Sequence, residues 1–318
     1  MSRNARLRST IGLCLLLAVS SLGAATDTDY KMPPDPLPGI VDTPPTPTVL
    51  LSPDRTWMLL IERPNLPSIV ELAEPELRLA GRRIRPRTNG PSRGSYVTGL
   101  TLKRMSDLSE RPITNLPEGA RLGNPRWSPD GTRIAFTVTG ETDIRLWVAE
   151  VEDGLARRVP CGRLNATGGS PFRWLPDSQR IVCTAVPEGR GAEPAAPHVP
   201  EGPVVQENIG KTAPARTYQD LLENAHDEKL FEYYLTSQLV LVDVDRKSRK
   251  IGSPGIVWDF DPSPDGRYLL VEIIHRPFSY LVPASRFPRR IEVWDHDGNL
   301  VHQVADLELK EEVPTGFG

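Results

Sequence analysis

One short motif in this sequence has the spacing of a catalytic serine. Gly90-Pro-Ser92-Arg-Gly94 fits the pattern Gly-x-Ser-x-Gly, in which a nucleophilic serine sits on a strained turn between a buried strand and a helix. Here an arginine-rich polar stretch precedes Ser92, and residues 96–102 read as a strand after it. Both neighbours are wrong for a nucleophile elbow. We therefore expect Ser92 to lie in a loop and identify no catalytic residue in this chain.

Other chemistry-bearing residues form no recognisable site. The five histidines are His198, His226, His275, His296 and His302. None is spaced as in the metal motif His-Glu-x-x-His. Asp243 and Asp245 indicate a solvated strand end, and no phosphate loop or dinucleotide fingerprint occurs. We expect no metal and no cofactor.

Cys161 and Cys183 fit two interpretations. Disulfides are permitted in an exported protein, so the two residues could be paired. The preferred alternative is that they are small buried hydrophobic side chains. Asn165-Ala-Thr167 is a glycosylation sequon of a kind that is common by chance.

The first 25 residues are predicted to be a signal peptide. Arg3, Arg6 and Arg8 form a basic start, residues 11–22 are apolar, and residues 23–25 are small. This order is typical of secretory signals, and the apolar run is short for a membrane span. An uncleaved membrane anchor is the alternative. We expect an exported protein, periplasmic or extracellular, without a stable membrane anchor after cleavage, and the net charge of −3 predicts no nucleic-acid partner.

A four-fold repeat dominates residues 51–318. Tight turns containing Asp54, Asp130, Asp177 and Asp265 are each followed by an apolar strand. A strand–turn–strand element follows at residues 144–154, 238–245 and 291–304. Together the two elements make a four-stranded unit, and the spacing of 47 residues from Asp130 to Asp177 suits one propeller blade. We predict an all-β fold: an incomplete β-propeller of about four blades of four-stranded antiparallel sheet, the last cut off near Gly318. An irregular β-sandwich is the alternative.

Segments outside the repeat should carry short helices and loops. Residues 26–50 are Pro-rich and read as an extended strap. Insertions at residues 63–95, 187–235 and 275–288 each follow an apolar strand of the repeat. Helices are expected within residues 69–80 and over residues 217–235, where Thr217 and Asp220 have capping-box-like spacing. Because blades are antiparallel meanders, all three insertions should lie at one face, with the four Asp turns at the opposite face.

The non-repeat segments carry a family resemblance. They read LAEPELRLAGRRI at 72–84, RTYQDLL at 216–222, LFEYYLTSQL at 230–239 and HRPFSYLVPASRFPRR at 275–290. These strings resemble the N-terminal propeller of glutamyl endopeptidase-type serine peptidases of the prolyl oligopeptidase family. The resemblance implies that the propeller is followed by an α/β-hydrolase domain with Ser, Asp and His in that order. That C-terminal domain is absent from residues 1–318, so no catalytic residue can be assigned.

Two functions fit these observations. The chain is either the substrate-gating and substrate-selecting part of a secreted serine peptidase that hydrolyses peptides, possibly after Glu, or a standalone periplasmic propeller that binds a protein partner without catalysis. In the first case its partners are peptide substrates and the missing hydrolase domain. Arg276 and Arg286 lie in a family-like segment, and an Arg fork suits a carboxylate. They are the candidates for selecting acidic substrates, against the alternative of structural salt bridges.

Overall fold

The computed structural model describes residues 32–94, 96–197, 218–245 and 248–311. The chain divides into two compact units, Met1–Thr43 and Pro44–Gly318. In the first unit the one described element is a short helix, α2 (Leu37–Val41), with a proline in its first turn. The predicted signal peptide at residues 1–25 lies outside the described residues. The expectation of an extended strap over residues 26–50 is wrong for the described residues 32–50. This stretch contains helix α2 and most of the first strand of the first sheet.

The second unit begins with two antiparallel four-stranded sheets. The first sheet has the order β1 (Thr48–Leu51), β2 (Trp57–Glu62), β6 (Gly99–Arg104) and β7 (Glu110–Pro112). The second contains β8 (Arg121–Trp127), β9 (Arg133–Thr139), β10 (Ile144–Glu150) and β11 (Ala156–Arg158) in chain order. Strand β1 was missed in the sequence because three of its four residues lie within the Pro-rich segment 26–50.

Two further meanders share one long strand. Strands β12 (Phe172–Trp174), β13 (Arg180–Ala185), β14 (Ser237–Asp243) and the start of β15 (Ser248–Pro262) form the third sheet. The second half of β15 pairs with β16 (Tyr268–Ile274), which is followed by β17 (Arg289–Asp295) and β18 (Leu300–Leu307). The fourth sheet thus has four strands and ends at Leu307, so the expectation that it is cut off near Gly318 is wrong.

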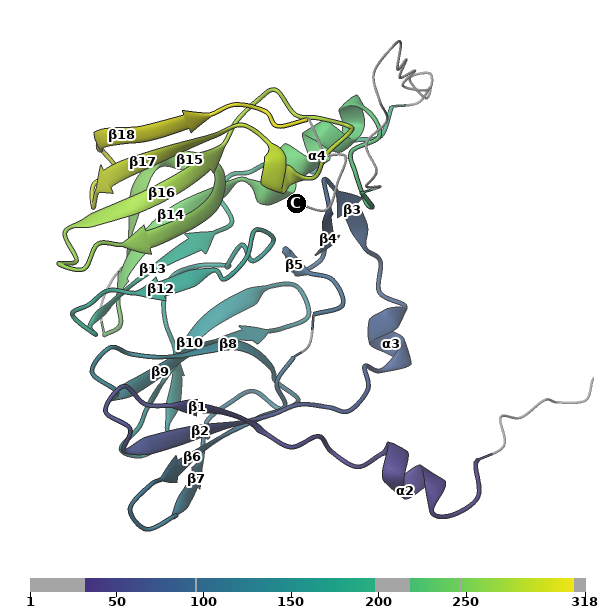
Figure 1. Ribbon diagram of the computed structural model, residues 1–318, viewed down its shortest axis with the longest axis vertical. Helices are drawn as coiled ribbons and strands as arrows, with labels where there is room; N and C mark the ends of the chain where they lie inside the picture. The colour runs from purple at the N-terminus through teal and green to yellow at the C-terminus, as the bar shows by residue number, and fades with distance from the viewer. Residues whose placement is uncertain (1–31, 95, 198–217, 246–247, 312–318) are drawn as a thin grey trace, which may run out of the picture. The chain divides into compact units, whose positions relative to one another are not determined.

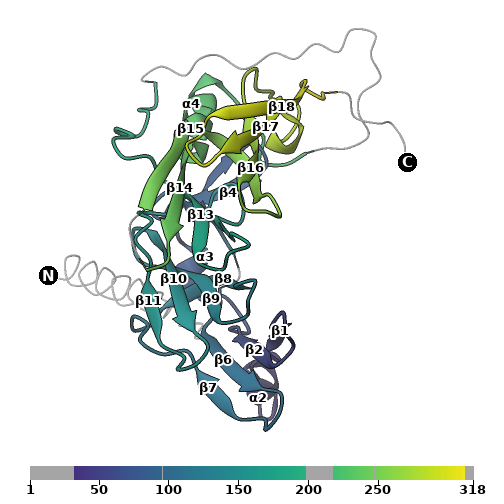
Figure 2. The same ribbon diagram turned by 90° about the vertical axis from the view of Figure 1, so that its left-hand side faces the viewer.

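Each Asp turn contacts the next Asp turn along the chain. Each turn is closed by its own side chains, as where Ser52 Oγ donates to Asp54 Oδ1 at 2.6 Å and Ser263 Oγ to Asp265 Oδ1 at 2.6 Å. Asp130 N donates to Ser178 Oγ of the third turn at 3.0 Å. A Cβ added to Gly266 would lie 3.3 Å from Pro176. The sheets therefore follow one another in chain order, which Figure 2 shows from β6 and β7 at one end to β17 and β18 at the other.

Apolar layers fill the space between successive sheets. Strand β9 sends Ile134 and Phe136 towards the first sheet and Ala135 towards the third. Strand β13 sends Ile181 into the layer shared with the second sheet and Val182 into the layer shared with the fourth. Strands β9, β13 and β14 of the second and third sheets are buried on both faces, as the sequence predicts for stacked sheets. The expectation is wrong for β2 and β16 of the first and fourth sheets, which are fully buried on one face only, because a single neighbouring sheet covers them. The all-β class and the antiparallel sheets are confirmed.

Both predicted helices are shorter than expected. Helix α3 (Ile69–Leu72) is one turn, capped by Ser68 Oγ, which accepts from Glu71 N at 3.1 Å. The chain then enters a small sheet of β3 (Leu77–Leu79), β4 (Arg82–Arg85) and β5 (Gly90–Pro91). Helix α4 is Ala225–Leu235, and its N-cap is Asn224, which accepts from Asp227 N at 2.9 Å. Asp220 has φ of 58°, so it cannot belong to a right-handed helix.

Candidate functional site

The three insertions emerge at one end of the sheets. They connect the second and third strands of the first, third and fourth sheets, whereas the Asp turns connect first and second strands. We call the end with the insertions the insertion face and the end with the Asp turns the turn face. In Figure 1 the insertion elements α3, β3, β4 and α4 lie on the right and the turns on the left. The expected opposition of insertions and turns is thus observed.

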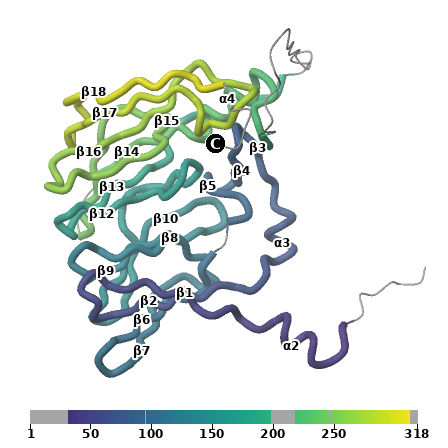
Figure 3. The backbone as a smooth tube through the Cα atoms, in the orientation of Figure 1, coloured from purple at the N-terminus to yellow at the C-terminus, as the bar shows by residue number. Residues whose placement is uncertain are grey.

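A single apolar core joins the insertions. Leu79 and Ile84 of the first insertion, Phe231 and Tyr234 of the second, and Phe278 and Phe287 of the third are all buried in it. The Phe231 ring packs edge-on against Phe278 at 5.1 Å and Phe287 at 5.5 Å between centroids. Figure 3 follows the chain from β2 through α3 to β3, which lies beside α4. The first insertion thus crosses from the first sheet to the insertions of the third and fourth.

Backbone hydrogen bonds fix these junctions. Gly81 N donates to Asp220 O at 2.7 Å, and Ala284 N donates to Ala80 O at 2.8 Å. The chain turns sharply here, with φ of 50° at Ala80 and 81° at Gly81. A Cβ on Gly81 would lie 2.8 Å from Pro283 Cβ. Only glycine combines this φ with such a close approach, which explains the glycine at position 81.

Buried amides form a second junction. Asn89 Nδ2 donates to Asn165 Oδ1 at 2.7 Å, and Asn165 Nδ2 donates to Tyr234 O at 2.9 Å. Thr167 Oγ1 also donates to Asn165 Oδ1, at 2.7 Å. Asn165 is 3% exposed, so the sequon at Asn165 is part of the interior of this fold and its amide is fully used.

The arginines singled out in the sequence lie in the third insertion. Arg276 Nε donates to Glu232 Oε1 at 2.8 Å, and its Nη1 pairs with Glu228, both on α4. These carboxylates, Glu232 first, raise the pKa of Arg276. The Arg286 guanidinium lies 5.9 Å from the centre of the Tyr218 ring. Arg276 therefore already holds two carboxylates, the arrangement expected of the structural alternative; a role of either residue in selection stays a prediction.

Ser92 and the histidines lie apart from any triad among the described residues. Ser92 Oγ donates to Glu76 Oε2 at 2.8 Å, and Ser92 lies in a turn after β5 that leads to strand β6 and not to a helix. His275 Nε2 lies 2.9 Å from Asp306 Oδ1. His296 is partly buried, and burial lowers its pKa. His198 lies outside the described residues.

The two cysteines are free, buried thiols. Cys161 and Cys183 belong to the apolar layer between the second and third sheets. The preferred interpretation, separate small hydrophobic side chains, agrees with this arrangement. Groups of three or more His, Cys, Asp or Glu that could hold a metal do not occur among the described residues, and no helix in that part of the chain is long and apolar enough to cross a membrane.

Sequence reasoning missed two residues that join distant segments. Arg190 falls in the insertion 187–235, and nothing in the sequence singles it out. In the structure its guanidinium lies 4.0 Å from the centre of the Tyr233 ring, and its Nη1 donates to Asn89 Oδ1 at 2.5 Å. Asn89 has φ of 58°, a conformation that asparagine tolerates. An Asn in the turn Thr-Asn-Gly was the one available local signal. The contact itself spans 101 residues and has no local signature.

The chain is thus an all-β protein of successive antiparallel sheets, with long insertions gathered at one face. Comparison with known proteins adds the family resemblance. The chain is 41% identical over 299 residues to a protein named "Probable glutamyl endopeptidase, chloroplastic" from Oryza sativa subsp. japonica, covering 90% of this chain and 32% of that protein. The protein of the same name from Arabidopsis thaliana is 41% identical over 303 residues, covering 91% of this chain and 31% of that protein.

These similarities confirm the resemblance to glutamyl endopeptidase-type peptidases. The chain spans about a third of the length of the curated relatives that it matches. Among solved structures, the β-propeller domain of the Trilobed protease from Pyrococcus furiosus is similar with a TM-score of 0.40 and 12% identity, over 83% of this chain and 59% of that one. No protein-family model matches the chain.

Proposed function

We propose that this chain is the propeller part of a secreted serine peptidase of the prolyl oligopeptidase family. In this proposal the four sheets are blades of an incomplete β-propeller, and Ser, Asp and His are supplied by an α/β-hydrolase domain outside residues 1–318. The predicted signal peptide directs the protein to the periplasm or the extracellular space. The name of the 41%-identical relatives supports peptides as substrates and cleavage beside Glu.

One observation carries the gating role. Insertions from three different sheets share a single core at the insertion face. Long elaborations on one face of a repeat scaffold usually mark its functional side. The N-terminal end of β1 and the C-terminal end of β18 also lie at this face. We infer that the insertion face meets the hydrolase domain and frames the passage of peptides towards it.

Hydrolysis assays test this assignment. The isolated chain should not hydrolyse Glu- or Pro-containing fluorogenic peptides, because its described residues bring no nucleophile, base and orienting acid together. The same chain joined to the hydrolase region of its gene should hydrolyse short Glu-containing peptides and leave folded proteins intact. Activity of the isolated chain that persists through purification and disappears in Ser92→Ala would overturn the assignment.

A standalone periplasmic propeller that binds a protein partner is the second candidate. The reading frame after Gly318 separates the two. Further blades followed by an elbow Ser, then Asp and His, support the peptidase. A stop codon together with a stable, monodisperse purified chain supports the binding module.

Acidic-substrate selection by Arg276 and Arg286 has its own test. In the protein that includes the hydrolase domain, selection requires that Arg286→Ala raise KM for Glu substrates while leaving KM for neutral substrates unchanged. Arg276→Ala must show the same pattern. An equal loss on both substrates indicates that the arginines only stabilise the third insertion, as the ion pairs of Arg276 suggest.

A further inference from the structure

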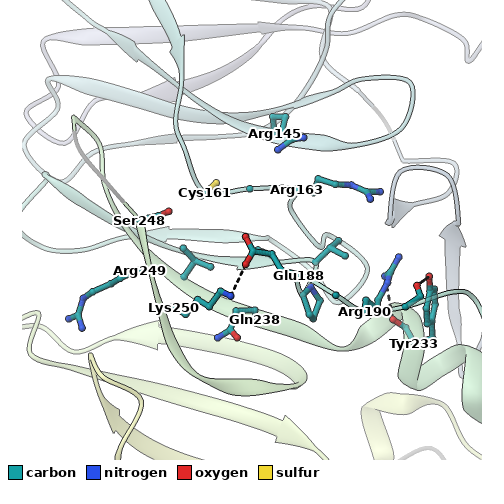
Figure 4. A pocket seen from close by; sticks show the side chains of 17 residues that line it. Arg145, Cys161, Arg163, Glu188, Arg190, Tyr233, Gln238, Ser248, Arg249 and Lys250 are labelled. Carbon is teal, nitrogen blue, oxygen red and sulfur yellow. Dashed lines mark hydrogen bonds and ion pairs between the residues drawn. The ribbon is translucent and has the colours of Figure 1, made fainter.

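A groove of about 680 Å³ lies between the second and third sheets. Strand β10 and the following connection form one wall, and β14 and β15 form the other; the first turn of the second insertion lies between them (Figure 4). Its charged lining is strongly basic, with a single acid, Glu188. The cations are Arg145, Arg163, Arg190, Arg249 and Lys250.

Three of these cations are already paired with carboxylates. Arg145 contacts Asp143 at 2.6 Å, Arg249 pairs with Asp297, and Lys250 Nζ lies 2.7 Å from Glu188 Oε2. The two remaining arginines have other partners. Arg163 Nη2 donates to Thr142 O at 3.0 Å, and Arg190 Nη1 donates to Asn89 Oδ1 and Tyr233 O. Among the described residues, no carboxylate neutralises Arg163 or Arg190.

Arg190 is held in a fixed orientation. Its guanidinium lies over Tyr233 at 4.0 Å and 5.5 Å from the centre of the Tyr234 ring. Within the described part of the chain, both of its hydrogen bonds use Nη1, so Nε and Nη2 remain to form a fork for a carboxylate. A fork that is already oriented loses little side-chain entropy when it binds.

Glu188 occupies the groove as an internal carboxylate. Its side chain is 83% exposed, and its pair with Lys250 lowers its pKa. Exposed pairs of this kind contribute little to stability. An external carboxylate can therefore replace Glu188 on Lys250 at little cost. The labelled cations in Figure 4 surround the groove on several sides, an arrangement that suits several spaced carboxylates better than one compact anion.

We propose that this groove binds an acidic peptide segment, with Arg163 and Arg190 contacting its carboxylates and Glu188 competing with them. The site lies between the second and third sheets and borders the core shared by the insertions at Tyr233, which packs against that core. The inference rests on the proposed function only in taking the ligand to be a peptide. It predicts that the chain without any catalytic domain binds such a segment.

The test measures binding of a fluorescently labelled hexaglutamate to the chain by anisotropy at low salt. Arg190→Lys, which keeps the charge and loses the fork, and Arg163→Ala should each weaken binding about tenfold. Glu188→Gln should strengthen it about threefold, because a competing charge is removed. Arg267→Ala is the matched control: it removes one cation from the turn face, where Arg267 pairs with Asp265, and should leave affinity within twofold.

Several results would overturn the proposal. Equal binding of labelled hexaglutamine, or equal effects of Arg163→Ala and Arg267→Ala, would show that the groove is not the site. Displacement of hexaglutamate by an equal or lower concentration of inorganic phosphate would show a small-anion site instead. Because Arg190 also joins Asn89 to Tyr233, melting temperatures accompany each variant, and Arg163→Ala carries the test if Arg190→Lys unfolds. Binding without any hydrolysis by the joined protein would refute the proposed function and leave this site standing.

Discussion

The substitution Phe231→Ala tests whether the insertions form one cooperative layer. Phe231 is fully buried on α4 and packs edge-on against rings of the third insertion. Truncation of a buried Phe costs about 3–5 kcal/mol, and the lost ring pairs place this site in the upper half of that range. At about 2–4 °C per kcal/mol, the melting temperature should fall by roughly 10 °C.

Amide hydrogen exchange locates the damage. In Phe231→Ala, exchange should rise together in residues 77–91, 225–235 and 278–287, because all three segments contribute to one core. Phe136→Ala is the matched control, since Phe136 is equally buried but lies between the first and second sheets. It should destabilise the protein by a similar amount without this joint increase. An increase confined to α4 in Phe231→Ala would refute the shared core.

Three further predictions concern the turns and the open end of the fourth sheet. Arg55 has φ of 61°, and the equivalent positions in the second and fourth turns are glycines. Arg55→Gly should therefore raise the free energy of unfolding by about 1 kcal/mol. A melting temperature below that of the original protein would contradict this prediction. Hydrogen bonds from Ser52 and Thr56 lower the pKa of Asp54 to about 2. This pKa is below the value of about 3.9 in an unfolded chain, so the stability that ionised Asp54 contributes is complete above pH 4 and is lost as pH falls towards 2. Asp54→Asn should remove that part of the dependence of stability on pH. A melting profile between pH 2 and 4 that is the same in the variant and the original protein would contradict this prediction. Val301 and Val304 are exposed on the edge strand β18, so the chain should self-associate, and the double Lys variant should elute as a smaller species in size-exclusion chromatography; equal elution would point elsewhere.

Local signals predicted the repeat well. A Ser-Pro-Asp turn closes through its own side chains, so its structure depends on few distant residues. The apolar strands after the second and third turns, β9 and β13, are buried on both faces, whereas β2 and β16 are fully buried on one face only, with Leu270 exposed. The insertions fall between second and third strands. The antiparallel sheets and the opposition of the two faces followed from this pattern alone.

Long-range contacts explain what the sequence did not reveal. Residue Asp220 lies outside α4 and accepts hydrogen bonds from Gly81 N and Arg83 Nε, both of the first insertion. Thr217, the predicted start of the helix, lies outside the described residues. Similarly, the segment after α3 forms β3 and β4 against α4 instead of continuing as a helix. Arg190 and Asn89 meet across 101 residues. The Thr-Asn-Gly turn signals the conformation of Asn89, but no local pattern in the sequence identifies the distant partner in any of these contacts.

Amine-reactive cross-linking of the complete gene product tests the central claim most directly, namely that the insertion face meets the hydrolase domain. Lys229 on α4 and Lys310 after β18 are exposed at the insertion face, whereas Lys103 lies at the turn-face end of β6. The account predicts that mass spectrometry finds cross-links from Lys229 and Lys310 to the hydrolase domain and none from Lys103. Cross-links from Lys103, with none from Lys229 or Lys310, would contradict it.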